Sequence, residues 1–437
     1  MKSFWKVWHI SLVFKLVVAA LLPLGADEAY YWVWSKNLQL SYYDHPAMIA
    51  WIFKAGHFLE PFLNAVRWPG VVMGHLTLVV WFLILRKHIN GDQLKIWIYL
   101  ILFSPLLGFG SIILTPDLPV LFFWSLALLF ALRALERRTA LDYFFLGIAL
   151  GLGFSSKYHI VLFLPCLIFY LQFEKRWHDL ILKFLPLTML AGIITSLPVI
   201  IWNFQNEFSS IVFQLKHGLE KSSYDFIWTA SYVLGEVLLI FPLIFYAALK
   251  ASPPKSLRWL PYFAWTPLLF FFFTSFRAST ELNWPIIAFP AALTLSVFHR
   301  KIMSWSKIYI FFWAFFYILV IGTIALPTFR KIHGKIEEPY QLRELAYLVQ
   351  QYRPLYADSY QVASSLWYFS KTPVFKLKDM SRFDFFDTLK EAEPSSSKFY
   401  LIQKSGNALP SWIKDTDWTL KLLQTFDGHY LLLEFSK

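Results

Sequence analysis

Four short stretches of the sequence contain carboxylate, imidazole and amine side chains that could take part in acid–base chemistry. They are "GADEAYYW" with Asp27 and Glu28, "YYDHP" with Asp44 and His45, "LTPDLP" with Asp117, and "FSSKYH" with Lys157. A carboxylate can accept a proton from a hydroxyl group, and an ammonium group can stabilise charge that develops on a phosphate. The stretches therefore offer both a base and a cation.

Each of these residues also has a purely structural interpretation. Asp27 could N-cap a helix from residue 28 to about 38, which would carry an interfacial aromatic belt that includes Tyr30 and Tyr31. Asp44 and His45 could cap a second interfacial helix.

Similar alternatives apply further along the chain. Thr115 could cap a helix whose first turn holds Asp117, and Lys157 could extend to the lipid head groups. Arg277 and Glu281 could pair with each other across a turn. Capping alone, however, does not explain why acids and a lysine gather at one end of several apolar segments, since charged groups at a membrane are costly and tend to be functional.

The apolar segments predict a membrane protein. About 20 apolar residues cross a bilayer, and about eleven runs fit: 8–24, 67–85, 94–113, 118–135, 141–155, 159–173, 180–202, 226–249, 259–276, 284–298 and 307–327. The two runs between 141 and 173 are short and could be broken helices. If the eleven alternate, the lysines and arginines of the short loops fall on one side, which the positive-inside rule makes cytoplasmic. The four chemical stretches then lie on the opposite side.

The composition changes after about residue 328. "YQLRELAYLVQQY" has helical periodicity, and "PLYADS" and "PVFKLK" read as strands around a helix "YQVASSLWYFS". "WTLKLLQTF" and "HYLLLEF" flank Asp427-Gly428 as strands of a hairpin do. We therefore expect a small α/β domain at 335–437 on the non-cytoplasmic side, after a transmembrane domain at 1–327 with interfacial helices in its first outer loop, 25–66.

Composition supports this organisation and excludes several classes. The chain is 57% hydrophobic and only 16% charged, and its single cysteine, Cys166, permits no intramolecular disulfide. The net charge of +12 is typical of cytoplasmic loops beside anionic lipids rather than of nucleic-acid binding. The basic, apolar N-terminus has a poor cleavage site and is interpreted as a retained signal anchor.

Several blocks of sequence, in order and spacing, resemble a known family. They are "DEAYYWVWSKNLQLSYYDHPAMIAW", "TPDLPVLFFW", "GIALGLGFSSKYH", "LPVIIWNFQNEFSSIVFQLKHG" and "ELNWPIIAFPAAL". Over residues 20–300 they are similar to bacterial membrane glycosyltransferases of the dolichyl-phosphate-mannose protein mannosyltransferase type, which include relatives of the lipid A aminoarabinose transferase and of envelope galacturonosyltransferases. The resemblance implies a GT-C fold in the bacterial inner membrane. It also implies transfer of a sugar, with inversion, from a polyprenyl phosphate to an acceptor outside the cytoplasm, such as lipid A, another glycolipid or a protein hydroxyl.

The resemblance also implies roles for particular residues. Asp27 matches the catalytic acid of the first loop, where Glu28 is its neighbour, and Asp117 matches the acid of the later Pro-Asp motif. Lys157 matches the lysine of the Ser-Lys-Tyr segment, for which contact with the donor phosphate is expected. Independently of the resemblance, the need for donor-binding groups makes Tyr158 and Arg277 further candidates. Candidates for substrate binding are Tyr30, Tyr31, Asp44, His45, Asn203, Glu281 and Asn283. A divalent metal ion, if one is used, would be held by Asp27 and Asp117.

Two positions depart from the family pattern, and two other functions remain alternatives. Ala47 replaces a second proline after Asp-His-Pro, and His159 stands where a small hydroxyl residue is common, so the preferred acceptor or lipid can differ.

A flippase for a lipid-linked sugar would place its ionisable residues near the bilayer midplane and often has paired halves, whereas this sequence places them at the outer boundary and shows no repeat. A scaffolding protein would not need the acids and the lysine.

Overall fold

The computed structural model describes residues 2–219, 224–414, 417–427 and 429–437. The chain divides into two compact units. The first comprises residues 1–20, 40–52 and 67–321, and the second comprises 21–39, 53–66 and 322–437. The second unit thus combines two segments near the N-terminus, 21–39 and 53–66, with the C-terminal residues, whereas the domain boundaries predicted from the sequence stay a prediction.

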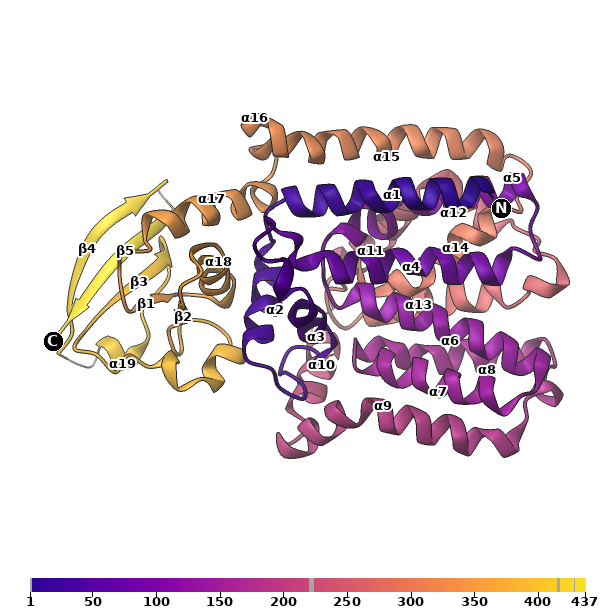
Figure 1. Ribbon diagram of the computed structural model, residues 1–437, viewed down its shortest axis with the longest axis horizontal. Coiled ribbons are helices and arrows are strands. Elements are labelled where there is room, and N and C mark those ends of the chain that lie inside the picture. Colours follow the sequence, from indigo (N-terminus) through magenta and orange to yellow (C-terminus); the bar gives the residue numbers. More distant parts are fainter. Residues whose placement is uncertain (1, 220–223, 415–416, 428) are drawn as a thin grey trace. The chain divides into compact units, whose positions relative to one another are not determined.

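The first unit is built from helices (Figure 1). Their bounds are α1 Lys2–Leu21, α3 Met48–Ala55, α4 Trp68–Leu85, α5 Gly91–Phe103, α6 Asp117–Arg137, α7 Ala140–Phe154, α8 Phe163–Phe173, α9 Leu185–Gln205, α10 Ser209–Leu219, α11 Phe226–Ile240, α12 Pro242–Leu249, α13 Leu260–Thr274, α14 Phe289–Ser296 and α15 Ile302–Ala325.

Each apolar run predicted from the sequence overlaps one of these helices or a broken pair of them. Within the described residues, five helices are long and apolar enough to cross a membrane, or up to seven if each bent pair is one span. The bent pairs lie at 91–112 and 226–249, where the chain turns by 71° and 90° just before Pro105 and Pro242. Proline removes a helical hydrogen bond and clashes with the preceding turn. The count of eleven spans therefore stays a prediction.

Glycines let α7 pack closely against α9, and the two helices lie side by side with α6 in Figure 1. A Cβ atom added at Gly147 would lie 2.2 Å from the Thr188 carbonyl oxygen, and one at Gly151 would lie 2.0 Å from Thr195 Oγ1. These two glycines of "GIALGLGF" thus allow the close approach of the two helices. The contact fixes the segment that leads directly into the Lys157 turn.

The second unit has a five-stranded sheet with helices. Its elements are α2 Ala26–Lys36, α16 Pro327–Arg330, α17 Gly334–Leu348, β1 Leu355–Ala357, α18 Tyr360–Ser370, β2 Phe375–Lys376, β3 Lys398–Lys404, α19 Ser411–Lys414, β4 Thr419–Phe426 and β5 Tyr430–Ser436. The strand order is β2-β1-β3-β5-β4, in which β1 pairs in parallel with β2 and β3, and β5 pairs antiparallel with β3 and β4.

Strands β1, β2, β4 and β5 and the helix α18 confirm elements predicted for this region, including the hairpin β4–β5, whereas β3 was not predicted. Gly428 of the predicted turn lies outside the described residues, and Asp427 has a positive φ of 48°. The pairing of β4 with β5 shifts register between Leu422 and Gln424, which marks a β-bulge.

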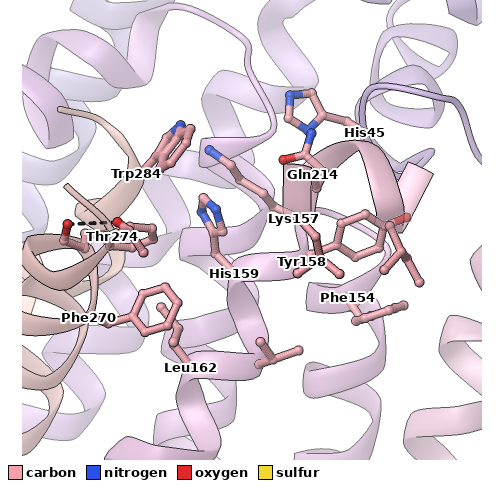
Figure 2. Close-up of a pocket in the computed structure, with 14 residues that line it drawn as sticks. His45, Phe154, Lys157, Tyr158, His159, Leu162, Gln214, Phe270, Thr274 and Trp284 are labelled. Atoms are coloured by element: carbon pink, nitrogen blue, oxygen red, sulfur yellow. Dashed lines mark hydrogen bonds between the residues drawn. The ribbon is translucent and has the colours of Figure 1, made fainter. Parts of the chain in front are cut away.

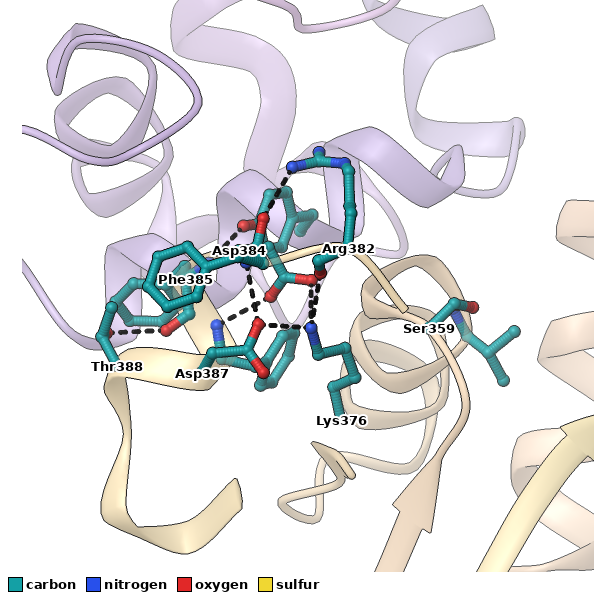
Figure 3. Close-up of polar contacts among 11 residues, drawn as sticks. Ser359, Lys376, Arg382, Asp384, Phe385, Asp387 and Thr388 are labelled. Carbon is teal, nitrogen blue, oxygen red and sulfur yellow. Dashed lines mark hydrogen bonds and ion pairs between the residues drawn. The ribbon is translucent and has the colours of Figure 1, made fainter. Parts of the chain in front are cut away.

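A buried ion cluster closes the loop that follows β2 (Figure 3). The Lys376 side chain is fully buried, and its Nζ lies 2.8 Å from Asp384 Oδ2 and also contacts the Asp387 carboxylate. It further donates to the Arg382 carbonyl oxygen at 2.8 Å. Because a buried ammonium group requires such partners, the cluster fixes the conformation of residues 382–388.

Candidate active site

Asp117 is the first residue of α6 and lies at the centre of a buried polar cluster in the first unit. Its Oδ1 accepts a hydrogen bond from Lys157 Nζ at 2.7 Å, and its Oδ2 accepts one from Asn283 Nδ2 at 2.7 Å. The side chains of Asp117 and Lys157 are less than one tenth exposed. Three residues that are distant in sequence, all predicted as candidates, are thus brought together.

Backbone hydrogen bonds hold the Lys157 turn in place between α7 and the 3₁₀ helix Tyr158–Leu162. The Lys157 N–H donates to the Gly153 carbonyl at 2.9 Å. On the other side of the turn, the Met48 N–H at the start of α3 donates to the Ser155 carbonyl at 3.0 Å. The start of α3 is therefore attached directly to the turn that carries the lysine.

Lys157 lines a largely apolar cavity of about 290 Å³ (Figure 2). The apolar lining comes from Phe154, Val161, Leu162, Ile211, Leu215, Phe270, Phe271 and Trp284, and the remaining lining residues are His45, Lys157, Tyr158, His159, Gln214 and Thr274. Figure 2 shows the amino end of Lys157 on the same side of the cavity as His45 and Trp284. A cation at the wall of an apolar cavity suits a ligand that has an anionic head and a hydrocarbon tail.

A second polar group lies beside the cavity. The Tyr158 hydroxyl donates to Ser210 Oγ at 3.0 Å and accepts from Asn203 Nδ2 at 3.2 Å. Gln214 Nε2 donates to the Asp44 carbonyl oxygen at 2.5 Å, which connects α10 to the segment just before α3. Tyr158 and Asn203 were predicted as candidates, whereas Ser210 and Gln214 were missed although both lie in one of the quoted blocks.

Arg277 and Glu281 do not join this cluster. Both side chains are exposed, and among the described residues no ion pair connects them. The structural alternative in which they neutralise each other across the turn is therefore wrong.

Asp27 and Glu28 belong to the second unit, where they have different environments. Helix α2 begins at Ala26 with Gly25 as its N-cap, and Glu28 Oε2 accepts a hydrogen bond from the Gly25 N–H at 3.0 Å. The Glu28 side chain is buried, whereas Asp27 is exposed and its Oδ1 lies 3.5 Å from the Tyr360 hydroxyl. The two adjacent carboxylates therefore are not equivalent.

The structure corrects three of the capping alternatives. Gly25 rather than Asp27 is the N-cap of α2, because Glu28 reaches back to the cap N–H. Pro116 rather than Thr115 is the N-cap of α6, which makes Asp117 its first residue. Helix α3 begins at Met48, so that Pro46 lies before the helix and forms a bridge with Ser41.

Tyr30 and Tyr31, which were predicted to bind substrate, are buried on α2. The Tyr30 hydroxyl accepts a hydrogen bond from the Phe385 N–H at 2.9 Å, and its ring lies 4.4 Å from that of Tyr360. The Tyr31 ring packs edge-on against Trp34 at 5.1 Å. These contacts give both tyrosines a packing role in the second unit.

Asp27 and Asp117 were suggested as ligands of a divalent metal ion, if one is used. In the part of the chain that the structure describes, no three His, Cys, Asp or Glu side chains gather as metal ligands do. The Asp117 carboxylate accepts hydrogen bonds from the amine of Lys157 and the amide of Asn283.

Comparison with known proteins identifies the fold. This chain superposes on the structure of ArnT from Cupriavidus metallidurans bound to undecaprenyl phosphate with a TM-score of 0.71. The superposition covers 99% of this chain and 98% of the ArnT chain, and the two sequences are 14% identical. The chain has the GT-C fold of ArnT. This finding confirms two parts of the predicted architecture, namely several apolar helices and a small C-terminal sheet.

Sequence comparisons confirm the predicted resemblance. Residues 44–202 match the dolichyl-phosphate-mannose-protein mannosyltransferase family. The chain is 25% identical over 312 residues to the lipid A galacturonosyltransferase RgtD of Rhizobium johnstonii, covering 64% of this chain and 61% of that protein. It is 30% identical over 221 residues to an undecaprenyl phosphate-α-4-amino-4-deoxy-L-arabinose arabinosyl transferase of Pseudomonas fluorescens, covering 44% of this chain and 40% of that protein. The chain thus spans less than two thirds of the length of either relative.

Proposed function

We propose that this GT-C protein is an inverting glycosyltransferase, which moves a sugar from a polyprenyl phosphate to an envelope acceptor. The acceptor is lipid A, another glycolipid or a protein hydroxyl. The names of the relatives support the donor and acceptor classes, and the fold is that of an enzyme whose structure contains undecaprenyl phosphate.

The observation that carries the proposal is the position of Lys157. Its ammonium group is held by the Asp117 carboxylate and lines an apolar cavity, so that one site offers a cation for a phosphate and hydrocarbon surface for a prenyl chain. A phosphate that enters competes with Asp117 for the same ammonium group. Asp117 and Asn283 therefore keep Lys157 in place when the donor is absent.

The reaction breaks the bond between the anomeric carbon of the sugar and the phosphate oxygen. The polyprenyl phosphate leaves with the electron pair and gains negative charge, which Lys157 stabilises. The acceptor oxygen forms a new bond to the anomeric carbon from the opposite face, and its proton passes to a carboxylate. We assign that carboxylate to Asp27, because Asp27 is exposed whereas Glu28 is buried and accepts from the N-cap of α2.

We also propose that the chain crosses the bacterial inner membrane about eleven times, with its C-terminus in the periplasm. The distribution of lysine and arginine among the short loops supports this orientation. Because the single cysteine, Cys166, is buried, a cysteine placed at Lys437 is suited to topology mapping. It is expected to react with a membrane-impermeant thiol reagent in intact spheroplasts, whereas labelling only after lysis would overturn the orientation.

Activity is tested with the purified full chain in lipid nanodiscs. The donor is undecaprenyl phosphate carrying 4-amino-4-deoxy-L-arabinose or galacturonic acid, the acceptor is lipid A, and mass spectrometry detects the added sugar. Because the natural sugar and acceptor are not fixed by this assay, the lipid A, surface glycans and glycoproteins of a deletion strain are compared with those of the parent strain. A missing mass increment identifies both sugar and acceptor.

The two experiments also separate a transferase from a flippase. A transferase gives a product whose formation is lost in Asp27→Asn. If proteoliposomes instead move the lipid-linked sugar across the bilayer, and neither the purified protein nor the deletion strain shows a change in glycosylation, the proposed activity is wrong.

A further inference from the structure

Lys15 is a buried cation in α1 that the proposed reaction does not use. Its side chain is 5% exposed, and Nζ donates to Ser111 Oγ at 2.6 Å. The Ser111 hydroxyl in turn donates to the Gly108 carbonyl oxygen at 2.8 Å. Within the described residues, Lys15 therefore has a neutral hydroxyl as its partner and no carboxylate.

The position of Lys15 makes this lack of a counter-charge costly. Lys15 lies six residues before the end of α1, which corresponds to about 9 Å along a helix. An ammonium group that is buried within such an apolar helix is expensive unless an anion or water accompanies it. The Lys15 side chain contacts Ser111 and does not extend past the end of the helix. Contact with lipid head groups, which an exposed lysine near a helix end could make, therefore does not explain the position of Lys15.

Lys15 lines a groove of about 550 Å³ that differs from the Lys157 cavity. Its walls come from α1, α5, the residues after the break in α5, and α15. Apart from Ser11 and Lys15, the lining residues are Val7, Ile10, Phe14, Tyr99, Leu102, Phe103, Gly108, Phe109, Ile112, Ala314, Tyr317, Ile318 and Ile321. None of these residues lines the Lys157 cavity.

Hydrogen bonds fix the wall of this groove. Where α5 breaks, the Tyr317 hydroxyl donates to the Ser104 carbonyl oxygen at 2.6 Å and accepts from the Phe109 N–H at 2.9 Å. A Cβ atom at Gly108 would lie 2.5 Å from that hydroxyl, so the glycine permits the contact. The groove is therefore part of the built structure, because the side chain from α15 satisfies backbone groups that the break leaves open.

The surroundings indicate what fills the groove. Only 22% of the apolar window of α1 and 17% of that of α15 are buried, so both helices present hydrocarbon surface to the bilayer. We infer that the groove binds an anionic phospholipid of the membrane, with its acyl chain along the apolar walls and its head group at Lys15 and Ser111. Charge complementarity selects an anionic lipid, and the separate lining residues distinguish this site from the proposed donor site.

Native mass spectrometry of the full chain tests the site with phosphatidylglycerol and phosphatidylcholine of identical acyl chains. The wild-type protein is expected to retain phosphatidylglycerol in preference. Lys15→Met should lower that retention about tenfold, because a charge-assisted contact to phosphate is lost. Lys301→Met, which changes an exposed lysine outside the groove, serves as the matched control and should leave retention unchanged.

A second variant keeps the inference testable if Lys15→Met fails to fold. Ala314→Trp fills the groove while it leaves Lys15 and Ser111 in place, and it should also reduce retention of phosphatidylglycerol. The inference is wrong if the wild-type protein retains both lipids equally, or if Lys15→Met retains phosphatidylglycerol as well as the wild-type protein does. Lys15 would then only form a hydrogen bond that connects two segments of the protein. If Lys15→Met lowers binding of polyprenyl phosphate instead, the groove belongs to the substrate and the inference is wrong.

Discussion

The backbone N–H of Phe385 donates a hydrogen bond to the hydroxyl of Tyr30 at 2.9 Å, across 355 residues of sequence. Tyr30 is one turn along α2 from Asp27, and Phe385 lies in the loop that the Lys376 cluster closes (Figure 3). The guanidinium carbon of Arg382, from the same loop, lies 4.9 Å from the centre of the Tyr360 ring, whose hydroxyl reaches Asp27. Residues near the C-terminus thus hold the helix that carries the proposed base.

Lys376→Met should destabilise this arrangement strongly. Removal of the cation leaves the buried Asp384 and Asp387 carboxylates without their counter-charge, which typically costs about 3–5 kcal/mol. The unfolding temperature should fall, and the Phe385 amide should exchange its hydrogen faster, since its acceptor Tyr30 is no longer held against the loop. Thermal unfolding and hydrogen exchange measure the two effects.

A neighbouring lysine supplies the control for that experiment. Lys378 pairs with Glu393 at the surface, so Lys378→Met should change neither measurement appreciably. Equal effects of the two substitutions would show that the buried cluster has no special role in holding the loop.

The stability of the second unit should fall as the pH rises from about 4 to about 6. Burial raises the pKa of Asp384 to about 6 from the usual 3.8, although Lys376 partly offsets the effect. The folded state therefore binds the proton more tightly than the unfolded state, and this stabilisation is present below pH 3.8 and lost as the pH passes 6. The change amounts to at most about 3 kcal/mol.

The measurement compares unfolding temperatures of the wild-type protein and Asp384→Asn across this pH range. The difference between the two should shrink or change sign between pH 4 and pH 6, because the variant lacks the titrating group. A pH-independent difference would contradict the raised pKa.

Asp27→Asn and Glu28→Gln should affect activity very differently. If Asp27 is the base, its amide variant should lower turnover by about 10² to 10⁴ at near-wild-type stability, because only the proton acceptor is removed. In Glu28→Gln the amide oxygen can still accept from the Gly25 N–H, so turnover should remain close to wild type. Steady-state transfer assays and thermal unfolding distinguish the two.

Normal transfer by Asp27→Asn would eliminate this residue as the base. Asp117 would then be the next candidate, and Asp117→Asn would have to be compared with Lys157→Ala, because the two side chains hold each other.

Lys157→Ala should raise the donor concentration needed for half-maximal rate by about 10- to 150-fold. The factor corresponds to about 1.5–3 kcal/mol for a charge-assisted contact to phosphate. The dependence on acceptor concentration should change little. Both are measured in the transfer assay with the sugar-loaded polyprenyl phosphate.

Lys157→Arg provides the conservative comparison, because a guanidinium group keeps the charge and should recover part of the donor affinity. Lys95→Ala, at an exposed lysine that does not line the cavity, should behave as wild type. Unchanged donor dependence in Lys157→Ala would leave Lys157 with a role in holding Asp117 only.

Periodicity and turn residues predicted much of the fold. The stretch "YQVASSLWYFS" forms α18 over the same residues, and the predicted stretches on either side of it form β1 and β2, which pair with each other in parallel. The helix breaks before Pro105 and Pro242 could have been predicted, because proline interrupts helices. They were missed because the apolar runs continue through both prolines.

Contacts between distant segments could not be predicted from the sequence in the same way. Asn283 reaches Asp117 across 166 residues, and nothing in "ELNW" indicates which acid its amide will meet. The true start of α2 was missed because Gly25 has no side chain to mark a cap, and Glu28 supplies the reciprocal hydrogen bond instead. Family resemblance brought these residues forward as candidates, whereas their hydrogen bonds required the three-dimensional structure.

The bulge in β4 affects how the sheet meets other molecules. Strand β4 lies at one edge of the sheet, where an unbroken row of open backbone groups would accept a strand from a second molecule. The register shift between Leu422 and Gln424 interrupts that row next to two exposed leucines, Leu420 and Leu422. At the opposite edge of the sheet, β2 has only two residues. Both edge strands, β2 and β4, are therefore poor templates for strand pairing with a second molecule. This protects the sheet from aggregation, although apolar side chains are exposed on β4.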